Sequence, residues 1–346
     1  MKKRDERIPQ SDVSLEKSDF MSDQMVKWCP GCGNHAILSS VAQLFPKMGY
    51  RKDHYVVVSG IGCSSRFPYY VNTYGFHGIH GRAAAIASGM KIANPSLSVW
   101  VNTGDGDSMA IGGNHFIHAI RRNVDMTVLM FNNRIYGLTK GQYSPTSPMG
   151  SVTKTSPYGT LEAPFNPCEL VIGAQGTFFA RVADNNIKNI TDVLEEAAMH
   201  RGTAVVELLQ NCIIFADKTH AAVTGKETRD DNQLFLEAGQ PLLFGKDKNK
   251  GIRLNGLRLE AVELGKNGIT IDDILVHDPY EHDPALQLMI AKMSPPHLPM
   301  ATGVIRSTEA PTFDRLMEEQ IAAQKTVSPV QCVDDLLNDG DVITID

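Results

Sequence analysis

The sequence lacks the features that would point to a membrane or a nucleic acid. No apolar run approaches the roughly 18 residues that a membrane-spanning helix needs, and no apolar segment follows the basic residues of the opening MKKRDERIPQSD. Positive charge is not in excess either. The formal net charge is -6, which gives no electrostatic reason to expect nucleic acid or an anionic membrane as a partner. We expect a cytoplasmic protein whose first residues, 1–19, are mobile.

Cysteine is scarce as well. The chain has 6 cysteines in 346 residues, at positions 29, 32, 63, 168, 212 and 332, which is too few and too scattered for a secreted disulfide scaffold. A second CxxC pair, which a zinc ribbon would normally show, is missing. The cysteines are therefore expected to be metal ligands, catalytic groups or small core residues.

The sequence does contain an alternation of strand-like and helical patterns. Short apolar runs lie at 54–60, 97–104, 126–132, 177–182 and 203–210, and helical patterns lie at 81–94, 108–123 and 186–202. Near-continuous apolar strands joined by helical crossovers are typical of a parallel sheet covered on both faces. We therefore predict a doubly wound α/β domain over residues 20–215, with ligands beyond the carboxyl ends of its strands.

The pattern changes after residue 215. Residues 241–264 are typical of a β-hairpin around a Lys/Asp/Gly turn, 294–303 are too rich in proline for regular structure, and 310–325 form one amphipathic helical pattern. This predicts a C-terminal extension, 216–346, that wraps the main domain or a partner chain.

Two of the strand-like runs are followed by residues whose oxygen atoms could bind a hard metal ion. A Gly-Asp-Gly motif with Asp105 at its centre follows the run at 97–104, and Asn133 follows the run at 126–132. The carbonyl of Ile135, in the turn after Asn133, can point inward. Oxygen ligands of this kind suit Mg²⁺, while the glycines let backbone N–H groups approach an anion closely. The sequence therefore predicts a magnesium and diphosphate site.

Four cysteines could form a second metal site. Cys29 and Cys32 lie in a CxxC turn within WCPGCG, Cys63 follows the run at 54–60, and Cys212 follows the run at 203–210. Four thiolates suit tetrahedral zinc or an iron–sulfur cluster. Cys168 is a competitor, because it begins a helix that also starts on the ligand side of the sheet.

The sequence resembles a known family. The segments WCPGCG, GIGCSSR and GDGDS match the β subunit of the 2-oxoacid:ferredoxin oxidoreductases from about residue 28 to residue 213, and GDGD followed by NN-x-IYG resembles the thiamine-diphosphate motif of 2-oxoacid oxidoreductases and decarboxylases. The resemblance implies one [4Fe-4S] cluster on Cys29, Cys32, Cys63 and Cys212, and Mg²⁺ on Asp105, Asn133 and the Ile135 carbonyl. It favours Cys212 over Cys168 as the fourth cluster ligand, and Cys332 is expected to be an ordinary thiol.

The resemblance also implies which loops line the cofactor. The expected lining residues are Ile61, Gly62, Cys63, Ser64, His80, Gly81, Arg82, Gly106, Asp107, Gly137, Leu138, Thr139, Lys140, Gly141 and Gln142. For His80, capping or packing under a helix is the alternative. His77 and His115 are expected to be structural, and Arg121 and Arg122 to serve the helix dipole or a partner contact.

Together the motifs imply a 2-oxoacid oxidoreductase. Thiamine diphosphate acts as an electron sink in 2-oxoacid decarboxylation, the cluster takes electrons singly, ferredoxin receives them, and coenzyme A collects the acyl group. Only one doubly wound domain is visible, so the glutamate that activates thiamine must come from an α subunit with the pyrimidine-binding domain, in an (αβ)₂ assembly. The alternatives are a thiamine-dependent decarboxylase or synthase with structural zinc, and an electron-transfer protein without thiamine. Intact Asp105 and Asn133 argue against the last.

The substrate prediction depends on two cations and one apolar residue. Arg66 in CSSR and Lys140 in NNRIYGLTKGQ could face the space over the thiamine, and Leu138 replaces the small or amide residue of pyruvate-specific relatives. An added cation suits a second carboxylate. With His80 as a further catalytic candidate, we expect 2-oxoglutarate to be converted to succinyl-CoA, and pyruvate or branched-chain 2-oxoacids are alternatives.

Overall fold

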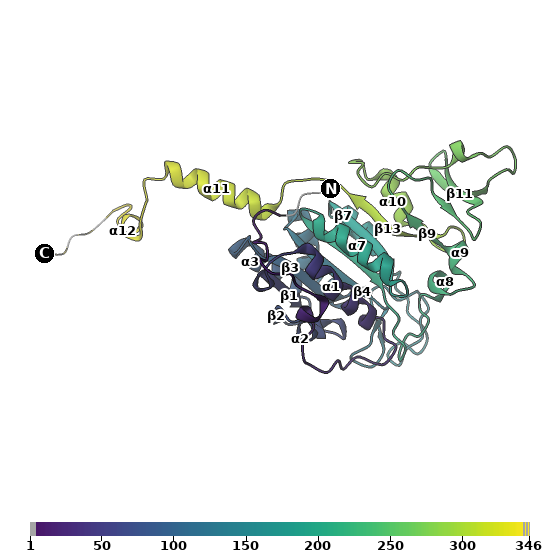
Figure 1. Cartoon of the computed structure of the whole chain (residues 1–346), viewed down its shortest axis with the longest axis horizontal. Helices are drawn as coiled ribbons and strands as arrows, with labels where there is room; N and C mark the ends of the chain where they lie inside the picture. The colour runs from purple at the N-terminus through teal and green to yellow at the C-terminus, as the bar shows by residue number, and fades with distance from the viewer. Residues whose placement is uncertain (1–4, 342, 344, 346) are drawn as a thin grey trace.

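A computed structural model describes residues 5–341, 343 and 345. Its centre is an eight-stranded sheet in the order β2-β1-β3-β4-β8-β7-β13-β9 (Figure 1). The strands are β1 (Tyr55–Ser59), β2 (Tyr74–His77), β3 (Ser98–Gly104), β4 (Met126–Asn132), β7 (Phe178–Ala183), β8 (Thr203–Leu209), β9 (Gln233–Leu236) and β13 (Met300–Ser307). From β2 to β7 all neighbours are parallel, so the predicted parallel sheet is confirmed.

Helices cover both faces of this sheet. The main ones are α1 (Asn34–Met48), α3 (Ala83–Ala93), α5 (Gly113–Arg122), α6 (Pro167–Gly173) and α7 (Ile187–Met199). One core cluster joins α1 and α7 to one face, and a second joins α3, α5 and α6 to the other. Successive residues of β1 alternate between the two clusters, Val57 in the first and Val56 and Val58 in the second, as the pleat of a strand requires.

The helix predicted at 108–123 is divided in two. A short helix, α4 (Asp105–Met109), ends before the glycine pair at 112 and 113, and α5 begins at the second of these glycines, Gly113. A Cβ on Gly112 would lie 2.4 Å from the Asp107 carbonyl oxygen, so the turn between the two helices needs glycine at this position.

The sheet continues beyond residue 215, where the sequence predicted a separate extension. β13 pairs antiparallel with β7, and β9 pairs parallel with β13. β13 lies partly in the segment 294–303 that was expected to lack regular structure; it begins at Met300, directly after the last proline of that segment. The boundary at 215 therefore does not coincide with an edge of the sheet.

The rest of the C-terminal part is built from smaller elements. β10 (Leu243–Phe244), β11 (Lys250–Asn255) and β12 (Arg258–Glu263) form a three-stranded antiparallel sheet where the hairpin was predicted. α10 (Ala285–Ala291) packs near β13, and α11 (Phe313–Val327) extends away from the body, followed by α12 (Val333–Leu337) (Figure 1).

The start of the chain packs against the body from Asp5 onward, although 1–19 were predicted to be mobile. Ile8 is buried, and Arg7 forms ion pairs with Asp314 at 2.7 Å and Asp125 at 3.2 Å. Within the described part of the chain, every helix is too short or too polar to cross a membrane.

Candidate active site

A hollow of about 200 Å³ lies beyond the carboxyl ends of β1, β3 and β4. Its walls come from the loops that follow these strands and from Gln210 after β8. The predicted residues that line it are Ile61, Gly62, Cys63, Ser64, His80, Asp105, Gly106, Asp107, Asn133, Ile135, Gly137, Leu138 and Thr139. Gly81, Arg82, Lys140, Gly141 and Gln142 lie outside this lining. The fold thus brings residues from four separate segments to the position expected for ligands of such a sheet.

Asp105 is a buried carboxylate at the base of this hollow. Its side chain accepts hydrogen bonds from the Ser144 hydroxyl at 2.5 Å and the Thr146 hydroxyl at 2.6 Å. Burial raises the pKa of Asp105, and the groups that oppose this effect are hydroxyls and backbone amides rather than a cationic side chain. A bound cation would stabilise the ionised form and remove this penalty.

Asn133 lies in the same wall with a fixed orientation. Its Nδ2 donates to the Gln210 Oε1 at 3.0 Å, and its Oδ1 accepts from the backbone N–H of Ile135 at 3.2 Å. Asp105, Asn133 and Ile135 all line the one hollow. The three predicted magnesium ligands are thus brought together.

Asp107 organises the loops around the hollow from within. One carboxylate oxygen accepts from the backbone N–H of Gly81 at 2.7 Å and of Ile61 at 3.1 Å, and the other accepts from the Thr103 hydroxyl at 2.9 Å. A Cβ on Gly60 would lie 1.9 Å from this carboxylate, so glycine is needed there. Asp107 therefore holds the loop after β1 and the loop before α3 against the end of β3.

Four cysteines meet at one side of the hollow. A methyl group on Gly137 would lie 3.5 Å from the Cys212 sulfur and 3.8 Å from the Cys63 sulfur. Burial raises the pKa of the Cys32 thiol to about 11, and repulsion from the thiolates of Cys63, Cys212 and Cys29 adds to the effect. The Cys32 sulfur also accepts a hydrogen bond at 3.1 Å from Gln210, another residue of the hollow's lining. Among the described residues, however, no three His, Cys, Asp or Glu side chains converge tightly enough for a single metal ion.

Cys168 and Cys332 lie apart from this group. Cys168 is fully buried in α6, in the core cluster on the α3 and α5 face. Burial raises the pKa of its thiol, and the charged groups that act on it are led by Arg181 and Glu207 rather than by the other thiols. Cys332 is exposed at the start of α12.

Of the residues predicted to recognise the substrate's distal carboxylate or chain, Leu138 lines the hollow, whereas Arg66 and Lys140 do not. Leu138 lines it with its side chain about half exposed. Lys140, at a positive φ of 76°, lines a neighbouring hollow of about 460 Å³ together with Phe215. The Arg66 guanidinium donates to the Tyr70 hydroxyl at 2.9 Å.

A buried polar network behind Asp105 was not found from the sequence. Thr146 also contacts the Asn132 Oδ1 at 2.9 Å, the Asn132 Nδ2 donates to Glu207 at 2.7 Å, and Arg181 pairs with Glu207 at 2.6 Å. The available signal was a charged residue inside each of two apolar strands, Arg181 in FFARVA and Glu207 in TAVVELL. Such charges are rarely buried unless they are paired.

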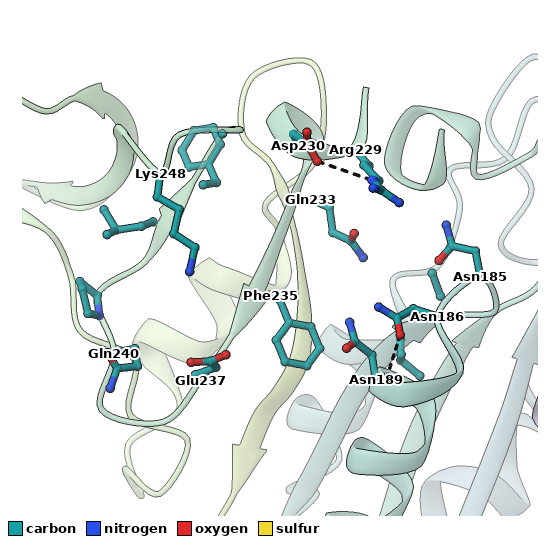
Figure 2. Close-up of a pocket in the computed structure, with 16 residues that line it drawn as sticks. Asn185, Asn186, Asn189, Arg229, Asp230, Gln233, Phe235, Glu237, Gln240 and Lys248 are labelled. Carbon is teal, nitrogen blue, oxygen red and sulfur yellow. Dashed lines mark hydrogen bonds and ion pairs between the residues drawn. The ribbon is translucent and has the colours of Figure 1, made fainter. Parts of the chain in front are cut away.

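A separate hollow of about 420 Å³ lies between the start of α7 and the strands β9 and β10 (Figure 2). Amide and charged side chains surround it, among them Asn186, Gln233, Glu237 and Lys248, with the Phe235 ring facing inward. It shares no lining residue with the hollow at Asp105 and contains none of the predicted site residues. The predicted site residues that line a hollow near Asp105 therefore surround the smaller of these two.

Comparisons with known proteins relate this chain to thiamine pyrophosphate enzymes and to 2-oxoacid oxidoreductase subunits. Residues 60–208 match the family model described as thiamine pyrophosphate enzyme, C-terminal TPP binding domain. The 2-oxoglutarate oxidoreductase subunit KorB of Mycobacterium tuberculosis is 46% identical over 98% of this chain and 91% of its own length. The 2-oxoacid:ferredoxin oxidoreductase subunit beta of Saccharolobus solfataricus is 38% identical over 83% of this chain and 93% of its own length.

A solved structure is similar over nearly the whole chain. It is the 2-oxoglutarate:ferredoxin oxidoreductase from Magnetococcus marinus with 2-oxoglutarate, coenzyme A and succinyl-CoA bound. The match has a TM-score of 0.75 and 29% identity, and it covers 95% of this chain and 97% of the other.

Proposed function

This chain belongs to the family of the 2-oxoglutarate oxidoreductase subunits KorB, and from that premise we propose that it is the thiamine-diphosphate-binding β subunit of a 2-oxoglutarate:ferredoxin oxidoreductase. The reaction is the reversible, coenzyme A-dependent oxidative decarboxylation of 2-oxoglutarate to succinyl-CoA and CO₂, with ferredoxin as electron acceptor. The observation that carries this proposal is the position of Gly137. It lines the hollow at Asp105 and lies against the sulfurs of Cys63 and Cys212, so the two predicted sites are contiguous.

The hollow fits Mg²⁺ and a diphosphate. Asp105 is a buried carboxylate whose hydrogen bonds come from hydroxyls, and Asn133 offers an amide oxygen beside it. We assign the metal to Asp105, Asn133 and the Ile135 carbonyl. Gly106 lies against the Tyr136 ring, whose Cε1 would be 2.2 Å from a Cβ, so this turn stays narrow and its backbone can approach the diphosphate. Thiamine diphosphate, when bound, supplies the electron sink for decarboxylation.

The four thiols offer one [4Fe-4S] cluster its usual set of ligands. Cys63 and Cys212 lie against Gly137 in the wall of the hollow, and the Cys32 sulfur accepts a hydrogen bond from Gln210 in the same wall. A cluster beside the hollow could take electrons from thiamine bound there, whereas zinc has no redox chemistry. We assign its ligands to Cys29, Cys32, Cys63 and Cys212. The burial of Cys168 in the opposite core supports its exclusion.

The remaining residues of the chain shape the substrate space. Asp107 holds the loops at Ile61 and Gly81, and so sets the width of the hollow. His80 and Leu138 line its mouth. We assign Arg66, three residues after Cys63, and Lys140, two residues after Leu138, to the distal carboxylate of 2-oxoglutarate.

A partner subunit is needed to complete the site. Ile111 and Leu138 line the hollow and are exposed, and so is Ile79, which precedes the lining residue His80. Tyr74 and Phe76 are exposed on the edge strand β2. Exposed apolar side chains gathered in one region are typical of an interface. We propose that an α subunit with the pyrimidine-binding domain covers this region in an (αβ)₂ assembly, and that ferredoxin and coenzyme A are the further partners.

Anaerobic co-expression with the partner chain tests the proposal. The purified complex should contain iron, acid-labile sulfide and thiamine diphosphate, and should reduce ferredoxin only with both 2-oxoglutarate and coenzyme A. The chain alone should be inactive. Zinc in place of iron, or turnover by the chain without its partner, would contradict the proposal.

A further inference from the structure

We propose that Gln210 is a positioning residue that joins the two halves of the site, because one end of its amide holds the metal ligand Asn133 and the other end donates to the cluster ligand Cys32. This inference rests on the proposed function. It adds a residue that tunes the cluster and orients the magnesium ligand through a single side chain.

The amide of Gln210 has each polar atom engaged. Its Nε2 donates to the Cys32 sulfur at 3.1 Å and to the backbone carbonyl of Asn211 at 2.6 Å, and its Oε1 accepts from the Asn133 Nδ2 at 3.0 Å. The side chain is buried, and the backbone N–H of Gln210 donates to the Asn132 carbonyl at 2.9 Å. The amide cannot rotate without breaking several hydrogen bonds, so its orientation is fixed.

The contact with Cys32 bears on electron transfer. A hydrogen bond to a cluster sulfur stabilises the negative charge that reduction adds, and so raises the reduction potential. The Gln210 Nε2 lies 3.1 Å from the Cys32 sulfur, within hydrogen-bond distance of the predicted cluster ligand. A neutral donor such as an amide stabilises the thiolate, whereas a carboxylate in the same place would repel it.

The contact with Asn133 bears on metal binding. Because the Asn133 Nδ2 is held by Gln210, the Oδ1 is the atom left beside Ile135 and the hollow. Without the acceptor on Gln210, the Asn133 amide could turn and present its NH₂ group, which is not a metal ligand. Residues that orient a metal ligand in this way typically change metal affinity by about 10- to 100-fold when they are replaced.

Two substitutions separate these roles. Gln210→Glu keeps an acceptor for Asn133 but removes the N–H donor to Cys32, and Gln210→Leu removes both. Gln233→Leu is the matched control, because Gln233 lies on β9 beside the other hollow (Figure 2). Each variant is purified anaerobically with its partner. The cluster potential is measured by redox titration with electron paramagnetic resonance, and the affinity for thiamine diphosphate with Mg²⁺ by calorimetry.

Both Gln210 variants should have a more negative cluster potential than the wild type, and the shift should be larger for Gln210→Glu. Affinity for thiamine diphosphate with Mg²⁺ should fall about 10- to 100-fold in Gln210→Leu and stay near the wild-type value in Gln210→Glu and Gln233→Leu. An unchanged potential in both Gln210 variants would overturn the role at Cys32, and an unchanged affinity in Gln210→Leu would overturn the role at Asn133. A wild-type complex without iron would contradict the proposed cluster itself. The affinity measurements would still test whether Gln210 orients Asn133.

Discussion

The two ends of the main sheet differ in whether a cationic side chain contacts the carboxylate there. At the amino end, Asp125 precedes β4 and forms ion pairs with Lys91 at 3.0 Å and Arg7 at 3.2 Å. At the carboxyl end, Asp105 follows β3 and receives hydrogen bonds from Ser144 and Thr146. The first carboxylate has its cations within the chain, and for the second we propose a cation that binds from solution.

We infer that the residues at the amino end of the sheet stabilise the fold, whereas those at the carboxyl end serve function. The amino-end cluster, made of Asp5, Arg7, Lys91, Asp125 and Asp314, joins the start of the chain, α3, β4 and α11. Removing one member of such a group leaves an uncompensated buried charge, which is strongly destabilising. At the carboxyl end, Asp105 is already a buried carboxylate to which no cationic side chain of the described residues donates a hydrogen bond. Changes at the amino end should therefore unfold the protein, and changes at the carboxyl end should remove activity from a folded protein.

The largest expected effect is at the carboxyl end. Replacing Cys29, Cys32, Cys63 or Cys212 by Ala should abolish electron transfer to ferredoxin and lower the iron content sharply, because a missing thiolate opens the cluster to loss. Cys168→Ala and Cys332→Ala are the controls and should keep their iron. Iron analysis of the anaerobic complex checks this. Loss of iron from Cys168→Ala with retention in Cys212→Ala would reverse the ligand assignment.

The next effect is at the amino end. Lys91→Met should destabilise the protein by about 3 to 5 kcal/mol, since Lys91 is buried against Asp125. The melting temperature should fall, while the affinity of the folded protein for thiamine diphosphate should not. Lys47→Met is the control, because Lys47 is exposed and its 4.0 Å ion pair with Glu195 lies at the surface. Equal melting temperatures for the two variants would show that the amino-end cluster does not stabilise the protein.

A smaller effect concerns the substrate. Arg66→Ala or Lys140→Ala should lower kcat/KM for 2-oxoglutarate by about tenfold to a hundredfold and leave pyruvate unaffected, because each removes a charge-assisted contact of roughly 1.5 to 3 kcal/mol. Steady-state kinetics with both substrates measures this. Equal losses on both would mean that these cations do not read the distal carboxylate, and a wild-type complex that prefers pyruvate would overturn the substrate assignment.

The smallest effect is the pH dependence of stability at the amino end. Burial alone would raise the pKa of Asp5, but hydrogen bonds from Arg7 and the charge of Lys91 lower it to about 2, below its ordinary value of 3.8. A depressed folded-state pKa stabilises the protein above the unfolded value, and this contribution is lost as pH falls from 3.8 toward 2. Because Asp5 is partly exposed, we expect roughly 1 kcal/mol. Melting curves of the wild type and Asp5→Asn should converge as the pH falls across this window, and a constant difference would contradict the prediction.

The elements that the sequence predicted correctly are those whose signal is local. The strands at 54–60 and 203–210 and the helix at 186–202 correspond to β1, β8 and α7, because each has an unbroken apolar run or a regular apolar period. β13 was missed because the prolines of 294–303 predicted irregular structure there, whereas its pairing partner β7 lies more than a hundred residues earlier in the chain. Its antiparallel pairing has no counterpart in the local pattern of the sequence.

The site residues also divide into those with a local sequence signal and those without one. Asp105, Asn133 and the four cysteines could be named because their spacing matches a family motif. Ser144, Thr146 and Gln210 could not, since each acts through a contact that only the folded chain creates. The sequence likewise could not show that the Arg66 guanidinium donates to the Tyr70 hydroxyl or that Lys140 lines the neighbouring hollow, because both contacts depend on the folded chain.

The most direct test of the account is the variant Asp105→Asn, measured in one preparation for both ligand binding and stability. We predict that calorimetry will show loss of thiamine diphosphate binding with Mg²⁺, because the neutral amide supplies no charge for the metal. The melting temperature without ligand should be equal to or higher than that of the wild type, because a buried and uncompensated carboxylate has been removed. Wild-type affinity, or a melting temperature lowered as far as in Lys91→Met, would contradict the assignment of function to the carboxyl end and stability to the amino end.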